Sequence, residues 1–432
     1  MDLLPCGHVA VAGPSRMCRH LLGSEGEDHV RLLTGRGLDF DLCCPACDRA
    51  ALDGDPPEPV SACEGCVTRC TEDDWYRLLA WHGEPEILTR AELLESAVVD
   101  VPLPVTAIDL VPAAAGTRPV WLLLATDGRI GRFDAGSGTW TQLAQATVPD
   151  EPDHRPWCGH RLRRRLHACP FGRFAAVVND YGHHGQVIDL RTGTPTLTLQ
   201  GGRHHPETVP FSLAFARHRD RTVVIHRTGW NRLDVSDAAT GELLTRREPA
   251  GSNRAESLPE HYLNYFHGAL HLSPGGRWIA DDGWVWTPAG LPHSWDAGRW
   301  LEDNVWESED GPSLRGLCVR AYHWDTPMCW TDESLLAISG IGSDDQAMLP
   351  GVRIFDVTTG TEVAAFAGPA GPLFAAGGRL YAAAPDGLQA WDPATGERTG
   401  TIPGFVPASH HPGAGELAGI SGNVLRRWAT PR

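Results

Sequence analysis

One short pattern recurs from about residue 98 to the end of the chain and limits the folds that the chain can adopt. The pattern is an alternating strand that ends in Asp, then Gly or Thr-Gly after a few residues, then another strand. A short β unit repeated at intervals of tens of residues is typical of an array of small sheets. Residues 285–290 are a degenerate copy, and residues 424–428 stand where a last outer strand is expected. The clear copies end at Asp134, Asp189, Asp237, Asp356 and Asp392.

A second motif precedes several of these units and joins two inner strands through a tight turn. Residues 272–280 contain Ser-Pro-Gly-Gly-Arg, residues 168–175 have the same shape, and residues 329–337 are a looser version. Together, the Asp-x-x-Thr-Gly turn and the Ser-Pro-x-Gly-Arg hairpin resemble the WD40-like and quinoprotein-like β-propeller superfamily over roughly residues 98–432. The resemblance implies a mainly β fold, a seven-bladed β-propeller with six or eight blades as alternatives, closed by pairing of its terminal strands.

The resemblance carries little information on function, because propellers host many unrelated activities. WD40 repeats usually carry a Trp-Asp dipeptide in each blade, and only Trp391-Asp392 stands at a matching place. Quinoprotein dehydrogenases of this shape are exported and bind a quinone and calcium. The first residues of this chain lack the pattern of a signal peptide, and no stretch of about 18 apolar residues occurs. We therefore expect a cytoplasmic protein that does not enter a membrane.

Cysteines are concentrated at the start of the chain, where eight of the twelve lie within the first 70 residues. Four of them form two CxxC pairs with the spacing of a zinc ribbon, which brings four thiolates onto one tetrahedral ion. Two Cys-x-His pairs stand upstream. The sequence predicts one Zn²⁺ and allows a second. The predicted metal ligands are Cys6, His8, Cys18, His20, Cys44, Cys47, Cys63 and Cys66.

The sequence leaves the pairing of these ligands open. Sequential pairing places the two Cys-x-His pairs on one ion and the two CxxC pairs on another, and is the simpler arrangement. A cross-brace, as in RING-like modules, joins the first pair to the third and the second to the fourth. Cys43 and Cys70 can each replace a neighbour. Zinc binding contributes roughly 10–16 kcal/mol in such modules, and closed sites of four protein ligands are structural.

Helical spacing follows the last of these cysteines. Trp75, Leu78, Leu79 and His82 predict one short helix, and a second is predicted around residues 87–96. These helices are expected to link the module to the sheets. The predicted domains are a zinc-binding Cys/His-rich module over 1–84, a helical linker over 85–97 and a β-propeller over 98–432.

Composition excludes several classes of function. The chain contains no lysine, which rules out a P-loop, a Schiff-base lysine and a protein kinase. Its formal net charge of −17 disfavours nucleic-acid binding and favours a basic or neutral partner. The richness in Arg, Ala, Gly and Pro resembles proteins of GC-rich bacterial genomes. The one basic run, at residues 157–165, is interpreted as a solvated loop paired with acids such as Asp150 and Glu151.

Other polar groups show no catalytic pattern. Histidine doublets and the acidic pairs at residues 281–282, 307–310 and 344–345 are interpreted as turns and exposed loops. Most of the sixteen tryptophans are expected to fill the space between blades, and a few at loop tips to anchor a ligand. We predict a non-enzymatic scaffold that binds a protein or peptide partner. The alternative is a propeller enzyme, either a hydrolase or a quinone-dependent oxidoreductase, with its site in the central funnel.

Overall fold

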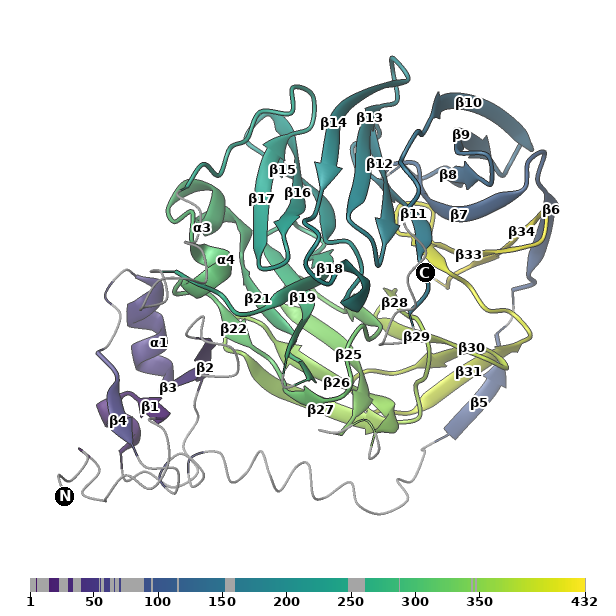
Figure 1. Cartoon of the computed structure of the whole chain (residues 1–432). Coiled ribbons are helices and arrows are strands. Elements are labelled where there is room, and N and C mark those ends of the chain that lie inside the picture. Colours follow the sequence, from purple (N-terminus) through teal and green to yellow (C-terminus); the bar gives the residue numbers. More distant parts are fainter. Residues whose placement is uncertain are drawn as a thin grey trace.

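The computed structural model is a mainly β protein, in which a closed ring of sheets forms a β-propeller and a small module lies beside it (Figure 1). Chain order runs around the ring from β7 back to β34. The described residues are 5, 15–22, 30–33, 40–53, 55, 58–62, 66, 70, 89–94, 96–114, 116–151, 160–247, 261–286, 288–342, 345 and 348–431.

The module is a four-stranded sheet with one helix, in the strand order β2-β3-β1-β4. Strand β3 runs parallel to β1 and antiparallel to β2. The helix begins with a proline at its first position, where the missing N–H costs no hydrogen bond. The elements are β1 (Ser15–Met17), η1 (Arg19–Leu21), β2 (Val30–Leu33), β3 (Phe40–Cys43), α1 (Pro45–Leu52) and β4 (Val60–Ala62).

Besides the module sheet, the described residues form seven sheets, numbered 1 to 7 along the ring. Sheet 1 contains β7 (Ala107–Pro112), β8 (Val120–Ala125), β9 (Arg129–Asp134) and β10 (Thr139–Gln145). Sheet 2 contains β11 (Arg163–Ala168), β12 (Phe174–Asp180), β13 (His184–Asp189) and β14 (Thr194–Gln200). Sheet 3 follows η2 (Pro206–Thr208) and contains β15 (Leu213–His218), β16 (Arg221–Gly229) and β17 (Arg232–Asp237).

The remaining sheets include sheet 4, in which two short helices interrupt the succession of strands. Sheet 4 contains β18 (Phe266–Leu272), β19 (Trp278–Val285), β20 (Ala289–Gly290), β21 (His293–Asp296), β22 (Arg315–Gly316) and β23 (Arg320–Ala321), with α3 (Ala297–Glu302) and α4 (Glu307–Asp310) between β21 and β22. Sheet 5 contains β24 (Met328–Trp330), β25 (Leu335–Ile341), β26 (Leu349–Asp356) and β27 (Thr361–Ala367). Sheet 6 contains β28 (Leu373–Ala376), β29 (Arg379–Ala384), β30 (Gly387–Trp391), β31 (Arg398–Pro403) and β5 (Thr89–Leu93). Sheet 7 contains β32 (Ser409–His411), β33 (Glu416–Ser421), β34 (Val424–Ala429) and β6 (Val99–Pro102).

The ring is closed by strands from both ends of the propeller. Strand β6 pairs antiparallel with β34, with Val101 opposite Leu425, so the predicted pairing of terminal strands is confirmed. Strand β34 is therefore the third strand of its sheet, and β6 supplies the outer one. Strand β5 adds to the outer edge of sheet 6 by parallel pairing with β31. Both pairings cover edge strands that would otherwise be open to association.

The recurrent aspartates hold the same turn in successive sheets. Each ends or follows a third strand, and its carboxylate accepts a hydrogen bond of 2.8–2.9 Å from the backbone N–H two residues later. Where a fourth strand or bridge follows, the glycine four residues after the aspartate has a φ of +68 to +72°, which a side chain would strain. The six aspartates are Asp134, Asp189, Asp237, Asp296, Asp356 and Asp392.

The Ser-Pro-x-Gly-Arg hairpin and the aspartate turn belong to one structural unit. The hairpin arginine reaches the aspartate at the end of the third strand, as Arg173 does with Asp189 at 2.8 Å and Arg277 with Asp296 at 3.1 Å. In sheet 4, Asp296 caps α3 instead of leading to a fourth strand. The degenerate repeat expected at residues 285–290 is therefore wrong, because those residues end β19 and begin β20.

Tryptophans fill the interfaces between neighbouring sheets, as expected. Trp121 packs with residues of sheet 7, Trp391 joins sheets 5 and 6, and Trp428 joins sheets 6 and 7. Each of these side chains is at most 1% exposed. The core of the ring is thus a series of apolar clusters between blades, which together fix the positions of the loops.

The helical linker is corrected in part. The helix predicted around residues 87–96 is wrong, because residues 89–93 form β5, whose backbone pairs with β31. Tertiary pairing overrides the helical spacing at this place. The helix predicted at residues 75–82 lies outside the described residues.

Candidate metal centre

Two chain segments meet at one end of the module sheet. Because β1 and β3 are parallel, with Met17 opposite Leu42, the residues that follow the two strands lie at the same edge. The Cys18 N–H donates to the Leu42 carbonyl at 2.8 Å, and the chain then turns into η1, which carries His20. On the other strand, Cys44 is the N-cap of α1, and Cys47 lies in its first turn.

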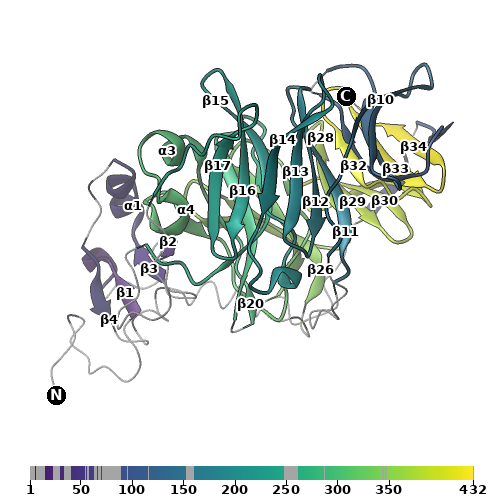
Figure 2. The same cartoon turned by 45° about the horizontal axis from the view of Figure 1, so that its top comes forward.

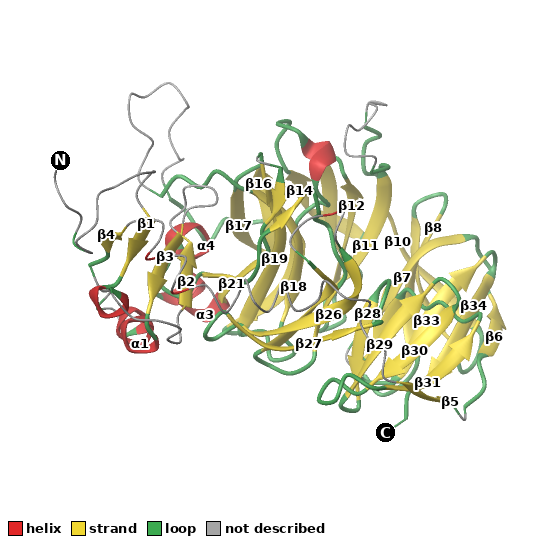
Figure 3. Cartoon of the chain, turned by 90° about the horizontal axis from the view of Figure 1, so that it is seen from below, coloured by secondary structure: helices red, strands yellow, loops and turns green. Residues whose placement is uncertain are grey.

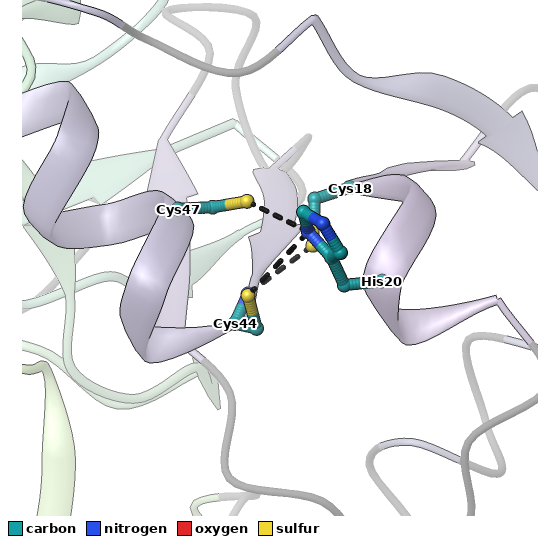
Figure 4. A group of neighbouring side chains, drawn as sticks. All are labelled: Cys18, His20, Cys44 and Cys47. Carbon is teal, nitrogen blue, oxygen red and sulfur yellow. Dashed lines mark hydrogen bonds between the residues drawn. The ribbon is translucent and has the colours of Figure 1, made fainter.

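The four side chains Cys18, His20, Cys44 and Cys47 point toward one another (Figure 4). One ligand atom from each lies within 4.8 Å of the others. His20 Nδ1 is 3.1 Å from Cys47 Sγ and 3.8 Å from Cys44 Sγ. The Cys44 backbone N–H donates to Cys18 Sγ at 3.3 Å. Such N–H···S bonds stabilise a thiolate ligand and fix its direction.

The thiols of this group shift the pKa values of one another, as closely spaced acidic groups do. Burial opposes the ionisation of Cys44, but hydrogen bonds from the Cys47 backbone and from neighbouring groups lower its pKa overall. Burial, together with Cys44 and Cys18, raises the pKa of Cys47 to about 12. A bound metal ion would supply a positive charge that stabilises both thiolates and displaces the proton of Cys47.

The arrangement fits zinc in donor type and in spacing. Zn–S and Zn–N bonds of about 2.3 and 2.0–2.1 Å in a tetrahedron place ligand atoms roughly 3.5–3.8 Å apart. The distances around His20 Nδ1 bracket this range closely enough for small side-chain rotations to complete the site. Three cysteines and one histidine are a known structural zinc set with no open position for water.

The structure combines the second predicted ligand pair, Cys18 and His20, with the third, Cys44 and Cys47. Neither sequential pairing nor a cross-brace contains this combination. The physical reason is the parallel pairing of β1 with β3, which the spacing of cysteines does not encode. Cys6, His8 and Cys63 lie outside the described residues.

The other described cysteines of the module are buried beside this site. Cys43, Cys66 and Cys70 are each at most 4% exposed and belong to the same apolar cluster as Met17 and Leu42. Cys70 Sγ lies 3.5 Å from the Leu21 carbonyl. Cys66 is thus near the site but outside the group of four, so its predicted role as a ligand stays a prediction.

The module is attached to the ring through a buried ion pair. Asp48 follows Cys47 in α1 and binds Arg315 of β22, and these residues are 3% and 1% exposed. Strand β2 also contacts β22, and the views in Figures 2 and 3 place the module beside α3, α4 and sheet 4. Burial raises the pKa of Asp48, and the Arg315 guanidinium opposes that shift. Sequence reasoning missed this pair because 267 positions separate its members.

Exposed and partly buried aromatic side chains gather on one rim of sheets 3 and 4, and we call them the aromatic rim. Trp286 and Tyr322 are 46% and 63% exposed, and the Tyr322 N–H donates to Pro288 at 2.9 Å, which holds their two loops together. The His205 ring lies 4.8 Å from Trp286. His205 and Tyr322 have positive φ values of 45° and 56°, so the loop of each residue holds a sterically demanding backbone conformation. The rim comprises His204, His205, Trp230, Trp286 and Tyr322.

The last three residues of the predicted basic loop, residues 163–165, belong to strand β11. Arg163 and Arg165 lie in β11 and bind Asp180 at 3.2 and 3.3 Å, whereas Arg164 binds Asp150 at 2.7 Å as expected. Residues 152–159 lie outside the described part of the chain. Arg163, Arg164 and Arg165 thus each have an intramolecular acidic partner.

The acidic pairs and the first histidine doublet also differ from simple exposed loops. Asp281 and Asp282 are buried in the middle of β19, and residues 307–310 form α4, in which Glu307 is fully buried. His183 and His184 surround Glu151, which also accepts their backbone N–H groups at 2.9 and 3.0 Å. That carboxylate fixes the turn between β12 and β13. Asp344 lies outside the described residues.

None of the described helices is long and apolar enough to cross a membrane. No protein-family model and no curated protein sequence matches the chain. Among solved structures, the chain is similar to one from the "Crystal Structure of Mitotic Checkpoint Complex", with a TM-score of 0.48 and 15% sequence identity over 81% of this chain and 95% of that chain. These comparisons assign the chain to no family.

Proposed function

We propose that this protein is a non-enzymatic interaction scaffold, in which the propeller and a zinc-stabilised module present fixed surfaces to a protein or peptide partner. The observation that carries the proposal is the aromatic rim. Trp286 and Tyr322 expose 46% and 63% of their surface on loops held by a hydrogen bond between them. Large aromatic side chains fixed in place are the usual centres of binding energy at interfaces.

The donor set of the metal centre supports a structural role for the module. Three cysteines and one histidine complete a tetrahedron and leave no position for a substrate. The Asp48–Arg315 ion pair then holds the metal-stabilised module against sheet 4. In this proposal zinc fixes a surface, and its removal changes binding through loss of the module.

The charge of the chain narrows the partner chemistry. A formal net charge of −17 repels acidic polymers and attracts basic segments over long range. Arginine or lysine side chains of a partner also stack favourably on exposed indole and phenol rings. The proposed partner is therefore a protein segment that carries basic residues beside apolar ones.

The test is affinity capture from native lysate, together with elemental analysis and absorbance spectroscopy of the purified chain. Trp286→Ala combined with Tyr322→Ala is expected to reduce recovery of a stoichiometric partner at least tenfold. Phe171→Ala is the matched control, because Phe171 is also exposed, at 47%. Phe171 lies in the loop before β12, the second strand of sheet 2, whereas Trp286 lies in the loop after β19, the second strand of sheet 4. These two residues therefore lie at opposite rims of the ring.

Two results would overturn the proposal. Equal recovery of the partner with the double variant and with Phe171→Ala would remove the rim from the interface. A bound organic cofactor in the purified chain would instead favour the alternative, an enzyme with its site in the central funnel.

A further inference from the structure

A second group of metal-binding side chains lies inside sheet 4, away from the cysteines. His267 is on β18, Asp281 on β19 and His293 on β21, and all three are fully buried. Asp281 and His293 are direct cross-strand partners. A register shift in β18 between Phe266 and Ala269 marks a bulge at His267. Bulges often redirect a side chain at functional positions, and this one brings the imidazole to Asp281.

The three side chains converge on one carboxylate oxygen. His267 Nδ1 is 2.6 Å and His293 Nε2 is 3.8 Å from Asp281 Oδ2. The other oxygen, Asp281 Oδ1, accepts the Gly268 backbone N–H at 2.8 Å. One ligand atom from each residue lies within 4.8 Å of the others. The carboxylate is therefore oriented by the backbone and presents one oxygen to two imidazoles.

The imidazoles have more polar atoms than hydrogen-bond partners. Among the described residues, both nitrogens of His293 and Nε2 of His267 are buried without a hydrogen bond. The nearby Tyr265 hydroxyl donates its only proton to the Leu291 carbonyl at 3.0 Å, so it cannot donate to either imidazole. Buried polar groups are nearly always satisfied by protein, water or an ion, so the unpartnered His293 Nε2, which lies 3.8 Å from Asp281 Oδ2, points to a missing ligand between them.

The surroundings favour a cation at this place. Imidazole nitrogens without a hydrogen-bond partner offer lone pairs to a metal ion. Asp281 supplies the negative charge, and the Tyr265 and Trp295 rings, 4.3 and 5.4 Å from the His293 ring, limit access by solvent. Two imidazoles and one carboxylate are a donor set for zinc and related divalent transition metals.

We propose that His267, Asp281 and His293 bind a divalent transition-metal ion within sheet 4, independent of the cysteine site. Its role is structural, because no ligand residue is exposed and no substrate can approach. The ion ties the inner strand β18 to β19 and β21, in the sheet whose strands are interrupted by α3 and α4. Three protein donors leave a position that a small ligand such as water can complete.

The first test is metal content of the full chain, measured by elemental analysis after dialysis against metal-free buffer. His293→Gln and Asp281→Asn are each expected to contain one equivalent of metal less than the wild type. Cys44→Ser with Cys47→Ser is expected to lose a different equivalent. His226→Gln is the control, because His226 is also buried but binds Ser236 in sheet 3, and its metal content should equal that of the wild type. Unchanged metal in both His293→Gln and Asp281→Asn would overturn the proposal.

A second test needs no variant and so does not depend on whether a variant folds. Crystals of the wild-type chain, grown from protein expressed with zinc, are examined at the zinc absorption edge. An anomalous peak within bonding distance of Asp281 Oδ2 and His293 Nε2 supports the proposal. A peak at the cysteine site alone, with an ordered water between the imidazoles, would overturn it without affecting the proposed interaction function.

Discussion

The module and the ring are stabilised by different kinds of core. In the ring, aliphatic and aromatic side chains fill each interface, and Trp121, Trp391 and Trp428 are almost completely buried there. In the module, five of the nine buried cluster members are cysteines. Thiols contribute less burial than the large side chains of the ring, and a small segment cannot compensate by area.

This difference separates two sources of folding free energy in one chain. The ring gains stability from many interfaces of similar kind, so loss of one contact weakens it only in part. In the proposed arrangement, the module depends on the metal centre at Cys18, His20, Cys44 and Cys47 and on one buried ion pair to the ring. We therefore expect changes at the metal site to unfold the module while the ring keeps its structure.

The largest effect is expected when the cysteine ligands are removed. Cys44→Ser with Cys47→Ser should abolish the metal site and with it about 10–16 kcal/mol of binding free energy that stabilises the module. Limited proteolysis should then cut the chain within residues 15–62, while the fragment that contains the ring stays intact.

The control for removal of a thiol is Cys329→Ser in sheet 5. Burial raises the pKa of Cys329 to about 12, and this thiol belongs to none of the groups of metal-binding side chains that the described residues form. The Cys329→Ser chain should resist protease in the module as the wild type does. Equal resistance of the double variant would mean that the module folds without its metal.

The next effect concerns the attachment of the module. Asp48→Asn leaves the Arg315 guanidinium buried without its counter-charge, and breaking such a pair typically costs about 3–5 kcal/mol. We expect the module to keep its metal but to separate from sheet 4, which faster hydrogen exchange in β22 would report. Asp53→Asn, at the exposed end of the same helix, makes the same charge change and should leave exchange in β22 unaltered.

Acid should weaken the ring through histidines that are buried in the neutral form. Burial lowers the pKa of His226 to about 4, below its ordinary value of 6.5, although Asp234 acts in the opposite direction. The unfolded chain thus binds this proton at a higher pH than the folded chain does. Stability should fall as pH decreases from about 6.5 to about 4, by up to about 1.4 kcal/mol per pH unit for this residue.

The measurement is the denaturant midpoint of the ring against pH. His226→Gln should reduce the pH dependence of the unfolding free energy over this window by the contribution of about one bound proton. Burial also lowers the pKa values of His167, His271 and His410 to about 4, so a slope should remain in the variant. A wild-type midpoint that is constant between pH 6.5 and 4 would contradict this prediction.

The sequence predicts features that depend on local chemistry and misses those that depend on distant pairing. The aspartate turn is local, since Asp189 binds the N–H of Arg191, and the same residues repeat wherever the turn does. The combination of Cys18 with Cys44 depends on parallel pairing of β1 and β3, which no spacing of ligands encodes. Asp281 resembles an exposed acid in the sequence because its partners, His267 and His293, come from other strands.

The smallest effects are expected within the repeated turn itself, where two copies of the motif differ in one contact. Asp392→Ala removes the hydrogen bond from the Ala394 N–H and should cost about 0.5–1.5 kcal/mol. Asp189→Ala removes the equivalent bond and also the two bonds from Arg173, at 2.8 and 3.1 Å. Asp189→Ala should therefore lower the thermal midpoint more than Asp392→Ala does. The variant Arg173→Met tests whether the arginine causes this difference. In the Arg173→Met background, Asp189→Ala and Asp392→Ala should lower the thermal midpoint equally. If Asp189→Ala still had the larger effect, the difference would come from the burial of Asp189 and not from the arginine of the hairpin.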